Sequence, residues 1–456
     1  MYQTHPNSPP PQPALPEEER QKREADKRKA RKNNGAKRGI HYEMEQEEHD
    51  VYPEDPDFDI NNARLVTIAT RICVRYECVP MRFIKHVYKI HTYAQDGRLF
   101  EGKTPVSAFL NSSYDGSFIA GLMELRYIQS LPVERIINYF ESHGFTLKKP
   151  TAHKLMEKAS SLFENLYKCI RQTALSDPYK AADETYYKIL VPEKNSKGKG
   201  VRKGYLWVVV GINTRMIYLL YDDGSRSEKV ILNELGGCKG IIQSDGYSPY
   251  RKLESDAYPH ITRIPCLQHI KRKFIDCGED DPDAKRIVEM INTLYQNEHK
   301  HKIGVDGWTV EQNLVHRKKY APDILGEIKD VLDDIEERGD LLPKSELKEA
   351  ITYLRNEWNA VVDIFNYGDT YLDNNIVERM NRYISLSRKN SLFFGSHKGA
   401  ERGAILYTIA LTCRMNKVNL FEYLTDVINR TAEWQPNTPL EKYRLLLPDR
   451  WEKAND

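Results

Sequence analysis

Three acidic residues at widely separated positions have surroundings that suit cation binding: Asp183, Asp245 and Glu378. Asp183 lies in a strand pattern rich in β-branched and aromatic residues, and Asp245 ends an apolar run that Gly246 can turn away from the sheet. A carboxylate at the carboxyl end of a buried strand packs poorly but can line a ligand crevice. Glu378 lies in a stretch of helical period, LDNNIVERMNR. These residues are therefore the first candidates for chemistry.

Mutual repulsion would govern the three carboxylates if the fold brought them together. Two like charges about 4 Å apart cost on the order of 4 kcal/mol at an effective dielectric of about 20, so such a cluster must take up protons or bind cations. All-oxygen ligands favour Mg²⁺ or Mn²⁺ over zinc, and a pair of such ions promotes in-line displacement at phosphorus. The pattern indicates phosphodiester chemistry. Spacing alone also allows another interpretation, in which the aspartates form turns and Glu378 pairs with Arg382 on the surface.

The helix predicted around Glu378 is amphipathic, with this acid in the middle of its polar face. Asp373 precedes the first turn and is the predicted N-cap. A cap accepts hydrogen bonds from backbone N–H groups, so Glu378 is preferred to Asp373 as the third acid. The two faces are predicted to hold Asn374, Asn375, Glu378, Arg382 and Ser385 on the polar side, and Ile376, Met380, Tyr383 and Ile384 on the apolar side.

Changes of periodicity along the chain predict the elements that position these acids. Residues 180–270 alternate strands and a helix in an order typical of a mixed α/β sheet. Residues 283–370 have a helical period in four charge-rich stretches, the third of which begins at Pro322. Residues 131–159 have the helix, glycine turn, helix order of a helix-turn-helix, although such hairpins also occur without a role in DNA binding.

These patterns divide the chain into seven segments. They are a basic and acidic arm expected to be disordered (1–60), a small β-rich segment (61–112), a helix-turn-helix-like region (113–178), the first part of an α/β core (179–277), a helical insertion (278–370), the second part of the core with the Glu378 helix (371–432) and a C-terminal tail (433–456).

Composition narrows the class of protein. Of the 456 residues, 40% are hydrophobic and 29% are charged, no apolar run approaches the roughly 20 residues of a membrane span, and the N-terminus has no signal-peptide pattern. We therefore expect a cytoplasmic protein with no membrane partner. The seven scattered cysteines fit reduced thiols better than disulfides. Residues 20–38 are strongly basic and residues 43–59 strongly acidic, and a basic arm fits either a nucleic-acid partner or a solvated tail.

Six motifs occur in order along the chain: ADETYYKI, GYLWVVV, IIQSDGYSPY, CLQHIKRKF, LDNNIVERMNR and SRKNSLFFGSHKGAERGAILYTIALTCRMN. Together they closely resemble the transposases of the insertion sequence 66 family, over roughly residues 60–451. The resemblance implies a ribonuclease H-like core interrupted by the helical insertion, with Asp183, Asp245 and Glu378 as an Asp-Asp-Glu triad. It implies two Mg²⁺ per active site, for which Mn²⁺ substitutes.

The activity implied by the resemblance is DNA transposition, in which strands are cut by hydrolysis and joined by transesterification. The implied partners are double-stranded DNA at the element's ends and at the target, a second copy of the chain on that DNA, and small companion proteins of the same element. Two alternatives keep the same fold. One is a catalytically decayed DNA-binding protein, and the other is a structure-selective nuclease.

Basic residues close to the three acids in the sequence are the candidates for binding DNA phosphates. They lie in the loop before the second core strand, in the HIKRKF segment and on the Glu378 helix. The candidates are Lys197, Lys199, Arg202, Lys203, Lys271, Arg272, Lys273, Arg382, Arg388 and Lys389.

Cys266 and His269 form a Cys-x-x-His pair at a strand-to-helix junction and, with Asp373 and Asn374, are candidates for positions near the site. A zinc site with Cys277 as a third ligand lacks a fourth ligand. No zinc is therefore expected, and packing or DNA contact is the predicted role of the pair.

The chain departs from the family pattern in two places. Many members carry a cysteine-paired zinc ribbon ahead of the helical region, whereas Cys73 and Cys78 have no second pair beside them. The Trp that often follows the Arg-Lys-Asn of the family is Ser391 here. Both departures bear on the recognition of DNA ends and leave the triad intact.

Overall fold

The computed structural model describes residues 81–85, 92–95, 98–101, 108–109, 112–193, 200–432, 434–435 and 437–453. All of them belong to one unit, Pro80–Asp456. The predicted N-terminal arm, together with Cys73 and Cys78, lies outside the described residues. None of the helices in the described part is long and apolar enough to cross a membrane.

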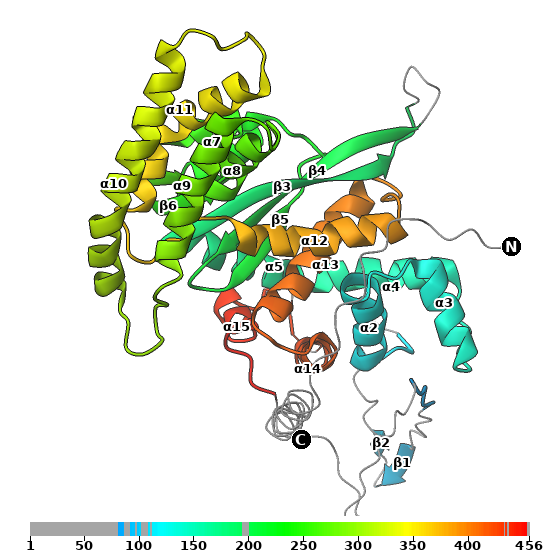
Figure 1. The fold of residues 1–456 in the computed structure, drawn as a ribbon. Helices are drawn as coiled ribbons and strands as arrows, with labels where there is room; N and C mark the ends of the chain where they lie inside the picture. Colours follow the sequence, from blue (N-terminus) through cyan, green and yellow to red (C-terminus); the bar gives the residue numbers. More distant parts are fainter. Residues whose placement is uncertain are drawn as a thin grey trace, which may run out of the picture. The chain divides into compact units, whose positions relative to one another are not determined.

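A five-stranded mixed sheet forms the centre of this unit, in the order β5-β4-β3-β6-β7 (Figure 1). Its strands are β3 (Tyr179–Leu190), β4 (Val201–Gly211), β5 (Met216–Leu220), β6 (Gly240–Ser244) and β7 (Ile261–Pro265). β3, β4 and β5 are antiparallel neighbours, while β6 runs parallel to both β3 and β7. The mixed α/β class predicted from the order of strand patterns is confirmed.

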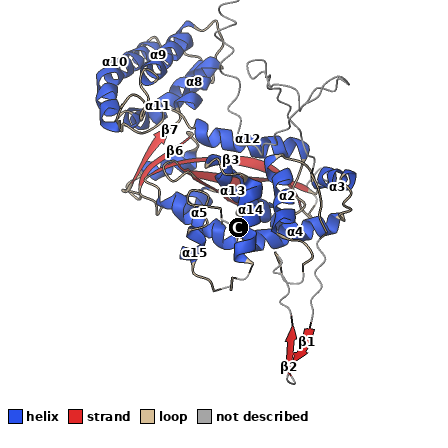
Figure 2. Cartoon of the chain, turned by 90° about the horizontal axis from the view of Figure 1, so that it is seen from below, coloured by secondary structure: helices blue, strands red, loops and turns tan. Residues whose placement is uncertain are grey.

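The central strands are continuous apolar runs in the sequence because their residues are buried on both faces of the sheet. Residues Leu206–Val210 of β4 are all at most 1% exposed, because both faces of the sheet are covered. In Figure 2, helix α12 (Asn375–Asn390) lies on one side of the sheet and α5 (Glu164–Ser176) on the other. This central packing fixes the position of the strand that carries Asp183.

Helix α13 (His397–Met415) covers the free edge of β5 through two threonines one turn apart. Thr408 Oγ1 accepts the Leu219 N–H at 2.9 Å, and Thr412 Oγ1 both accepts from Ile217 N–H at 3.3 Å and donates to Ile217 O at 2.8 Å. Four helical residues rise about 6 Å and two strand residues about 6.8 Å, so the two spacings match. The threonines therefore satisfy backbone groups that an edge strand would otherwise expose.

The region before the sheet is a short hairpin followed by helices. Strands β1 (Thr92–Gln95) and β2 (Arg98–Glu101) pair with each other, and helices α3 (Val133–Ser142) and α4 (Lys149–Leu162) follow later. Gly144, with φ of +83°, makes the turn between α3 and α4. The predicted helix, glycine turn, helix order is confirmed. The remaining helical elements here are α2 (Gly116–Met123) and the π-helix η3 (Glu124–Ile128).

Three long helices after β7 and α8 (Leu267–Ile275) form the insertion: α9 (Pro282–Glu298), α10 (Val310–Glu337) and α11 (Glu346–Ile364). They enclose a second hydrophobic core that also includes Tyr179, Ile241 and Ile264 of the sheet. The second and third of the predicted helical stretches form one helix, because α10 continues through Pro322. A proline loses one helical hydrogen bond, but buried Ala321 and Leu325 on either side pack the helix into this core.

The remaining elements complete the two faces of the unit. Between β5 and β7 lie α6 (Glu228–Leu235), α7 (Ser248–Arg251) and the 3₁₀ turn η4 (Lys252–Glu254). The C-terminal part of the described chain contributes α14 (Leu420–Thr431) and α15 (Leu440–Arg444).

A buried ion pair joins the insertion to the sheet. Arg263 of β7 is 2% exposed and donates to Glu357 Oε2 on α11 at 2.5 Å. The same guanidinium donates to the backbone oxygen of Asp245 at 2.8 Å and to Ser244 Oγ at 3.1 Å. One arginine thus fixes both the helical insertion and the turn that carries Asp245.

We expect Arg263→Met to lower the free energy of unfolding by about 3–5 kcal/mol, because it removes the hydrogen-bonded cation of the buried Glu357 and leaves it only Arg251, 3.9 Å away. Chemical denaturation of the purified protein measures the loss. The control is Lys149→Met, which breaks an exposed pair with Glu134 and should cost less than about 1 kcal/mol. Equal effects of the two changes would show that the Arg263 network does not stabilise the fold.

Candidate active site

The register of two parallel strands sets Asp183 level with Asp245. β3 and β6 pair Tyr179 with Ile241 and, two residues on, Ala181 with Gln243. Continued by two more residues, this register brings Asp183 opposite Asp245, which directly follows β6. Neighbouring strands lie about 4.8 Å apart, and level residues point to the same face. The two aspartates, remote in sequence, therefore meet at one end of the sheet.

Helix α12 docks on this end of β3 through two asparagines. Asn374, at its start, donates to Ala182 O at 3.0 Å, and Asn381 donates to Asp183 Oδ2 at 2.5 Å. Glu378 lies four residues after the first and three residues before the second, which places all three on one helix face. The helix that carries Glu378 therefore docks on the end of β3 that carries Asp183.

The predicted faces and cap of α12 need correction. Asn374 was expected on the polar face beside Asn375, yet Asn374 is only 2% exposed and packs on the sheet, whereas Asn375 is exposed. Asn374 is also the N-cap, in place of Asp373. Asp373 Oδ1 still accepts the Asn375 N–H at 3.1 Å, so its carboxylate faces backbone as a cap would. The hydrogen bonds to Ala182 and Asp183 explain the difference, because they draw polar residues onto the buried face.

The C-terminal half of α12 is anchored to the preceding helical region. Arg126 of η3 is 7% exposed and donates to Ser387 Oγ and Ser391 Oγ, each at 3.2 Å. Asn390 donates to Ser130 O at 3.2 Å. Both ends of the helix that carries Glu378 are therefore held by hydrogen bonds from distant segments.

Burial and repulsion perturb the acid at the centre of this arrangement. Burial, and then the charges of Glu184 and Asp245, raise the pKa of Asp183 from 3.8 to about 7. Hydrogen bonds from the Glu184 N–H and the Asn381 amide act in the opposite direction. Asp183 is thus partly protonated at neutral pH, and a cation would favour its ionised form.

Glu184 has its own cation. Its Oε1 accepts from Arg226 Nε at 3.0 Å, and its Oε2 accepts from the Tyr250 hydroxyl at 3.3 Å. Adjacent strand residues point to opposite faces, which is one reason to leave Glu184 out of the ligand set beside Asp183. The ion pair with Arg226 gives a second reason for that choice, since a paired carboxylate is less available to a metal.

A different set of donors meets Glu378 from the other side. His269 Nε2 lies 3.4 Å from Glu378 Oε1, and donor atoms of Cys266, His269 and Glu378 all lie within 4.8 Å of one another. Within the described residues, the two aspartates with Glu378 do not form such a group. Cys277, considered as a third ligand beside Cys266 and His269, is not a member either. It lies past the end of α8, where its thiol contacts Lys273 O.

Buried polar atoms without hydrogen-bond partners gather around Glu378. They are Glu378 Oε1, His269 Nδ1, Asn374 Oδ1, Asn381 Oδ1 and Tyr295 Oη. Buried polar groups are satisfied in the great majority of proteins, so such a group of atoms indicates a missing ion or water. Acid oxygens beside amide oxygens suit hard divalent cations. The residues present therefore fit the metal that the family resemblance implies.

Basic side chains next to this region lie on β4 and α12. Lys203 Nζ and Arg388 Cζ stand 4.3 and 3.9 Å from the centre of the Tyr186 ring, and Arg388 also donates to Tyr186 O. Arg202, Arg272, Lys273, Arg382 and Lys389 are exposed, and Lys271 is partly exposed. Lys197 and Lys199 lie outside the described residues. Whether these residues bind DNA stays a prediction.

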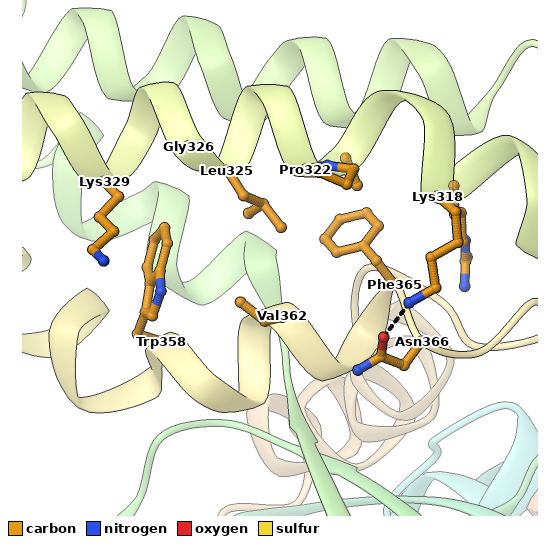
Figure 3. Close-up of a pocket in the computed structure, with 11 residues that line it drawn as sticks. Lys318, Pro322, Leu325, Gly326, Lys329, Trp358, Val362, Phe365 and Asn366 are labelled. Atoms are coloured by element: carbon orange, nitrogen blue, oxygen red, sulfur yellow. Dashed lines mark hydrogen bonds between the residues drawn. The ribbon is translucent and has the colours of Figure 1, made fainter.

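A hollow elsewhere in the unit has a different character. It lies between α10 and α11 and is lined mainly by apolar side chains such as Leu325, Trp358, Val362 and Phe365 (Figure 3). Lys318 donates to Asn366 at its rim. Its lining contains no carboxylate. The acidic region and not this hollow is therefore the candidate active site.

Sequence reasoning missed four residues that shape the site: Asn381, Arg226, Tyr250 and Arg263. Asn381 could have been found, because it lies one helical turn after Glu378 and two turns after Asn374. The other three reach the acids only through tertiary contacts, and no local pattern marks them.

Two neighbouring aspartates at the end of a mixed sheet, with the helix that carries Glu378 hydrogen-bonded to one of them, define a candidate centre for divalent cations. Residues 111–402 match the family model described as Transposase IS66 family, which is more than half of the chain. The chain belongs to the IS66 family of transposases.

Three curated relatives come from Sinorhizobium fredii and are named uncharacterized proteins y4jD, y4hP and y4qI. They are 26%, 24% and 26% identical to this chain, over 73%, 86% and 89% of its length. The matches cover 65%, 73% and 76% of the relatives, so the chain spans slightly less than two thirds of the first of them.

One solved structure is similar to this chain: the cryo-EM structure of piggyBac transposase synaptic complex with hairpin DNA. The alignment covers 75% of this chain and 77% of the piggyBac chain. The identity is 9% and the TM-score is 0.26. The fold assignment above rests on the strand order and not on this alignment.

We expect Asp183→Asn to stabilise the metal-free protein at pH 8. The raised pKa means that the folded state disfavours the charged carboxylate, so stability falls as pH rises from about 4 through about 7. A neutral side chain avoids that loss, and the gain should be about 1–3 kcal/mol at pH 8 and close to zero at pH 4. Thermal unfolding in a chelator at both pH values tests it. A destabilised variant at pH 8 would contradict the electrostatic account.

Proposed function

We propose that the chain is a DDE-type DNA transposase whose catalytic core has the ribonuclease H-like fold. Family membership supports the activity. The strand order β5-β4-β3-β6-β7, antiparallel in its first half and parallel in its second, supports the fold. Two observations support the catalytic assignment. The β3–β6 register, continued past Ala181 and Gln243, sets Asp183 beside Asp245, and Asn381 of the Glu378 helix donates to Asp183.

Asp183, Asp245 and Glu378 would hold two Mg²⁺, for which Mn²⁺ is the expected substitute. When bound, such ions neutralise charge at a phosphodiester and favour ionisation of an attacking water or 3′-hydroxyl. The chain's own groups orient the ligands. Asn381 and the Glu184 N–H hold the two oxygens of Asp183, and the Tyr247 N–H donates to Asp245 Oδ1 at 3.1 Å.

The proposed substrate is double-stranded DNA, at the ends of the element and at the target. Lys203 and Arg388 flank Tyr186, three residues after Asp183 on β3, and are proposed to contact DNA phosphates there. Work on two DNA ends suits a homodimer, and small companion proteins are expected from the family. Nucleolytic cleavage without joining would indicate the nuclease alternative, and binding without cleavage the decayed protein.

Asp245→Asn should abolish Mg²⁺-dependent strand cleavage while duplex binding persists. The loss should exceed the roughly 10–100-fold caused by removing an outer partner of a metal ligand, because a ligand itself is removed. Cleavage of a labelled duplex that bears the element's ends, with and without Mg²⁺, measures the activity. Following the fate of the 3′ end separates strand joining from simple hydrolysis.

The matched control is Asp256→Asn, an exposed aspartate in the loop before β7. It should cleave as the wild type does. Equal cleavage by the Asp245→Asn protein and the wild type would refute the assignment of Asp245.

Lys203→Ala should weaken binding to duplex DNA of any sequence, because it removes a phosphate contact that carries no base specificity. The slope of log affinity against log salt should fall in magnitude by about 1. Fluorescence anisotropy at several salt concentrations measures both quantities. Lys285→Ala, which removes an exposed charge on α9, is the control and should leave the slope unchanged. An unchanged slope for Lys203→Ala would exclude it from the DNA surface.

A further inference from the structure

The junction between β7 and α8 presents sulfur and nitrogen donors to Glu378. Cys266 is the N-cap residue of α8, and His269 lies in its first turn. Cys266 is 1% exposed, whereas the side chains of His269 and Glu378 are 26% and 24% exposed. One donor atom from each residue lies within 4.8 Å of the other two. A small ion could therefore enter from solvent toward a buried sulfur.

The distances are close to those that a zinc-like ion requires. Tetrahedral zinc has bonds of about 2.0–2.3 Å, which places its ligand atoms roughly 3.5 Å apart. His269 Nε2 and Glu378 Oε1 are already 3.4 Å apart. Small side-chain adjustments would bring the remaining pairs from at most 4.8 Å to that separation.

The surroundings also favour a bound cation. Glu378 Oε1 and His269 Nδ1 are buried and lack hydrogen-bond partners, and the nearby Tyr295 Oη is in the same condition. The backbone N–H of Asn374 donates to the sulfur of Cys266 at 3.2 Å. This contact opposes the effect of burial, which raises the pKa of the Cys266 thiol to about 12. Unsatisfied polar atoms and a supported sulfur thus converge on one point.

We infer that Cys266, His269 and Glu378 form a binding site for a thiophilic divalent transition metal of the Zn²⁺ class, which shares only Glu378 with the proposed Mg²⁺ site. A set of sulfur, nitrogen and oxygen donors selects such metals and disfavours Mg²⁺. Three protein ligands with an open fourth position are the pattern of a zinc site that keeps one position for water or substrate.

The sequence predicted no zinc because only Cys266, His269 and Cys277 were available near the junction. In the folded chain, the third donor beside Cys266 and His269 is Glu378, which belongs to a helix far along the chain, and not Cys277. Glu378 then serves either this site or the aspartate pair. This choice between two sites rests on the proposed function of Glu378. Metal binding by Cys266, His269 and Glu378 does not depend on that function.

Cobalt provides a direct test, because Co²⁺ occupies zinc sites and a Co²⁺–thiolate bond gives a charge-transfer absorption band in the near ultraviolet. The full chain, kept reduced with a phosphine, should bind Co²⁺ at about one per chain with this band, and Zn²⁺ should displace it. Cys266→Ser should lose the band, and His269→Ala should weaken Co²⁺ binding by more than about 100-fold, beyond the cost of losing an outer partner.

Two controls separate this site from others. Cys277→Ser changes a neighbouring thiol and should keep the band. Asp183→Asn changes the proposed Mg²⁺ site and should also keep it, so a failure of the transposase proposal leaves this test intact. Circular dichroism confirms folding of each variant, and Zn²⁺ should raise the melting temperature of the wild type but not of His269→Ala. Absence of the band in the wild type, or its survival in Cys266→Ser, would overturn the inference.

Discussion

Carboxylates buried beside one another without enough cations to balance them constrain the rest of this structure. Asp183 lies level with Asp245 and next to Glu184 in sequence, and its pKa rises to about 7 because burial and both neighbouring charges disfavour its ionised form. Such a group weakens the fold at neutral pH. The sheet can bear this loss because its central strands are packed on both faces, with Leu206–Val210 at most 1% exposed. The packed core therefore stabilises the fold, while the repulsion between carboxylates at the candidate site destabilises it, as is common at functional sites.

The hydrogen bonds that position the acids act mainly on backbone atoms. Arg263 holds the backbone oxygen of Asp245, and Asn374 holds the backbone oxygen of Ala182 beside Asp183. Contacts of this kind fix the backbone from which an acidic side chain extends, and they do not occupy its carboxylate oxygens. Glu378 follows the same principle, since its helix is anchored through Asn374, Asn381 and Ser387 while its own Oε1 has no hydrogen-bond partner. Hydrogen bonds also reach both oxygens of Asp183 and Oδ1 of Asp245, so these donors orient the carboxylates as well as their backbone.

The helical insertion contributes to the site as well as to the second core. Arg263 pairs with Glu357 of α11, so the turn after β6 and the insertion share one buried ion pair. Helix α8, which leads into the insertion, brings Cys266 and His269 against Glu378. Helix α8 thus presents sulfur and nitrogen to Glu378, while the carboxylates of Asp183 and Asp245 lie at the end of the sheet on which the Glu378 helix docks. Which set Glu378 joins depends on the cation that is present, because hard and thiophilic metals prefer different donors.

The sequence by itself determined the mixed α/β class, the helical insertion, the position of Asp245 after a buried strand and the identity of the three acids as candidates, because periodicity and turn residues are local signals. The family motifs added the expected roles. Only the tertiary structure decided that Asp183 is level with Asp245, that Asn374 faces the sheet, that α10 continues through Pro322 and that Glu378 contacts His269 in preference to solvent. Strand register, the packing of a helix around a proline and the partner of a buried donor depend on residues far away in the chain. No window of neighbouring residues contains that information.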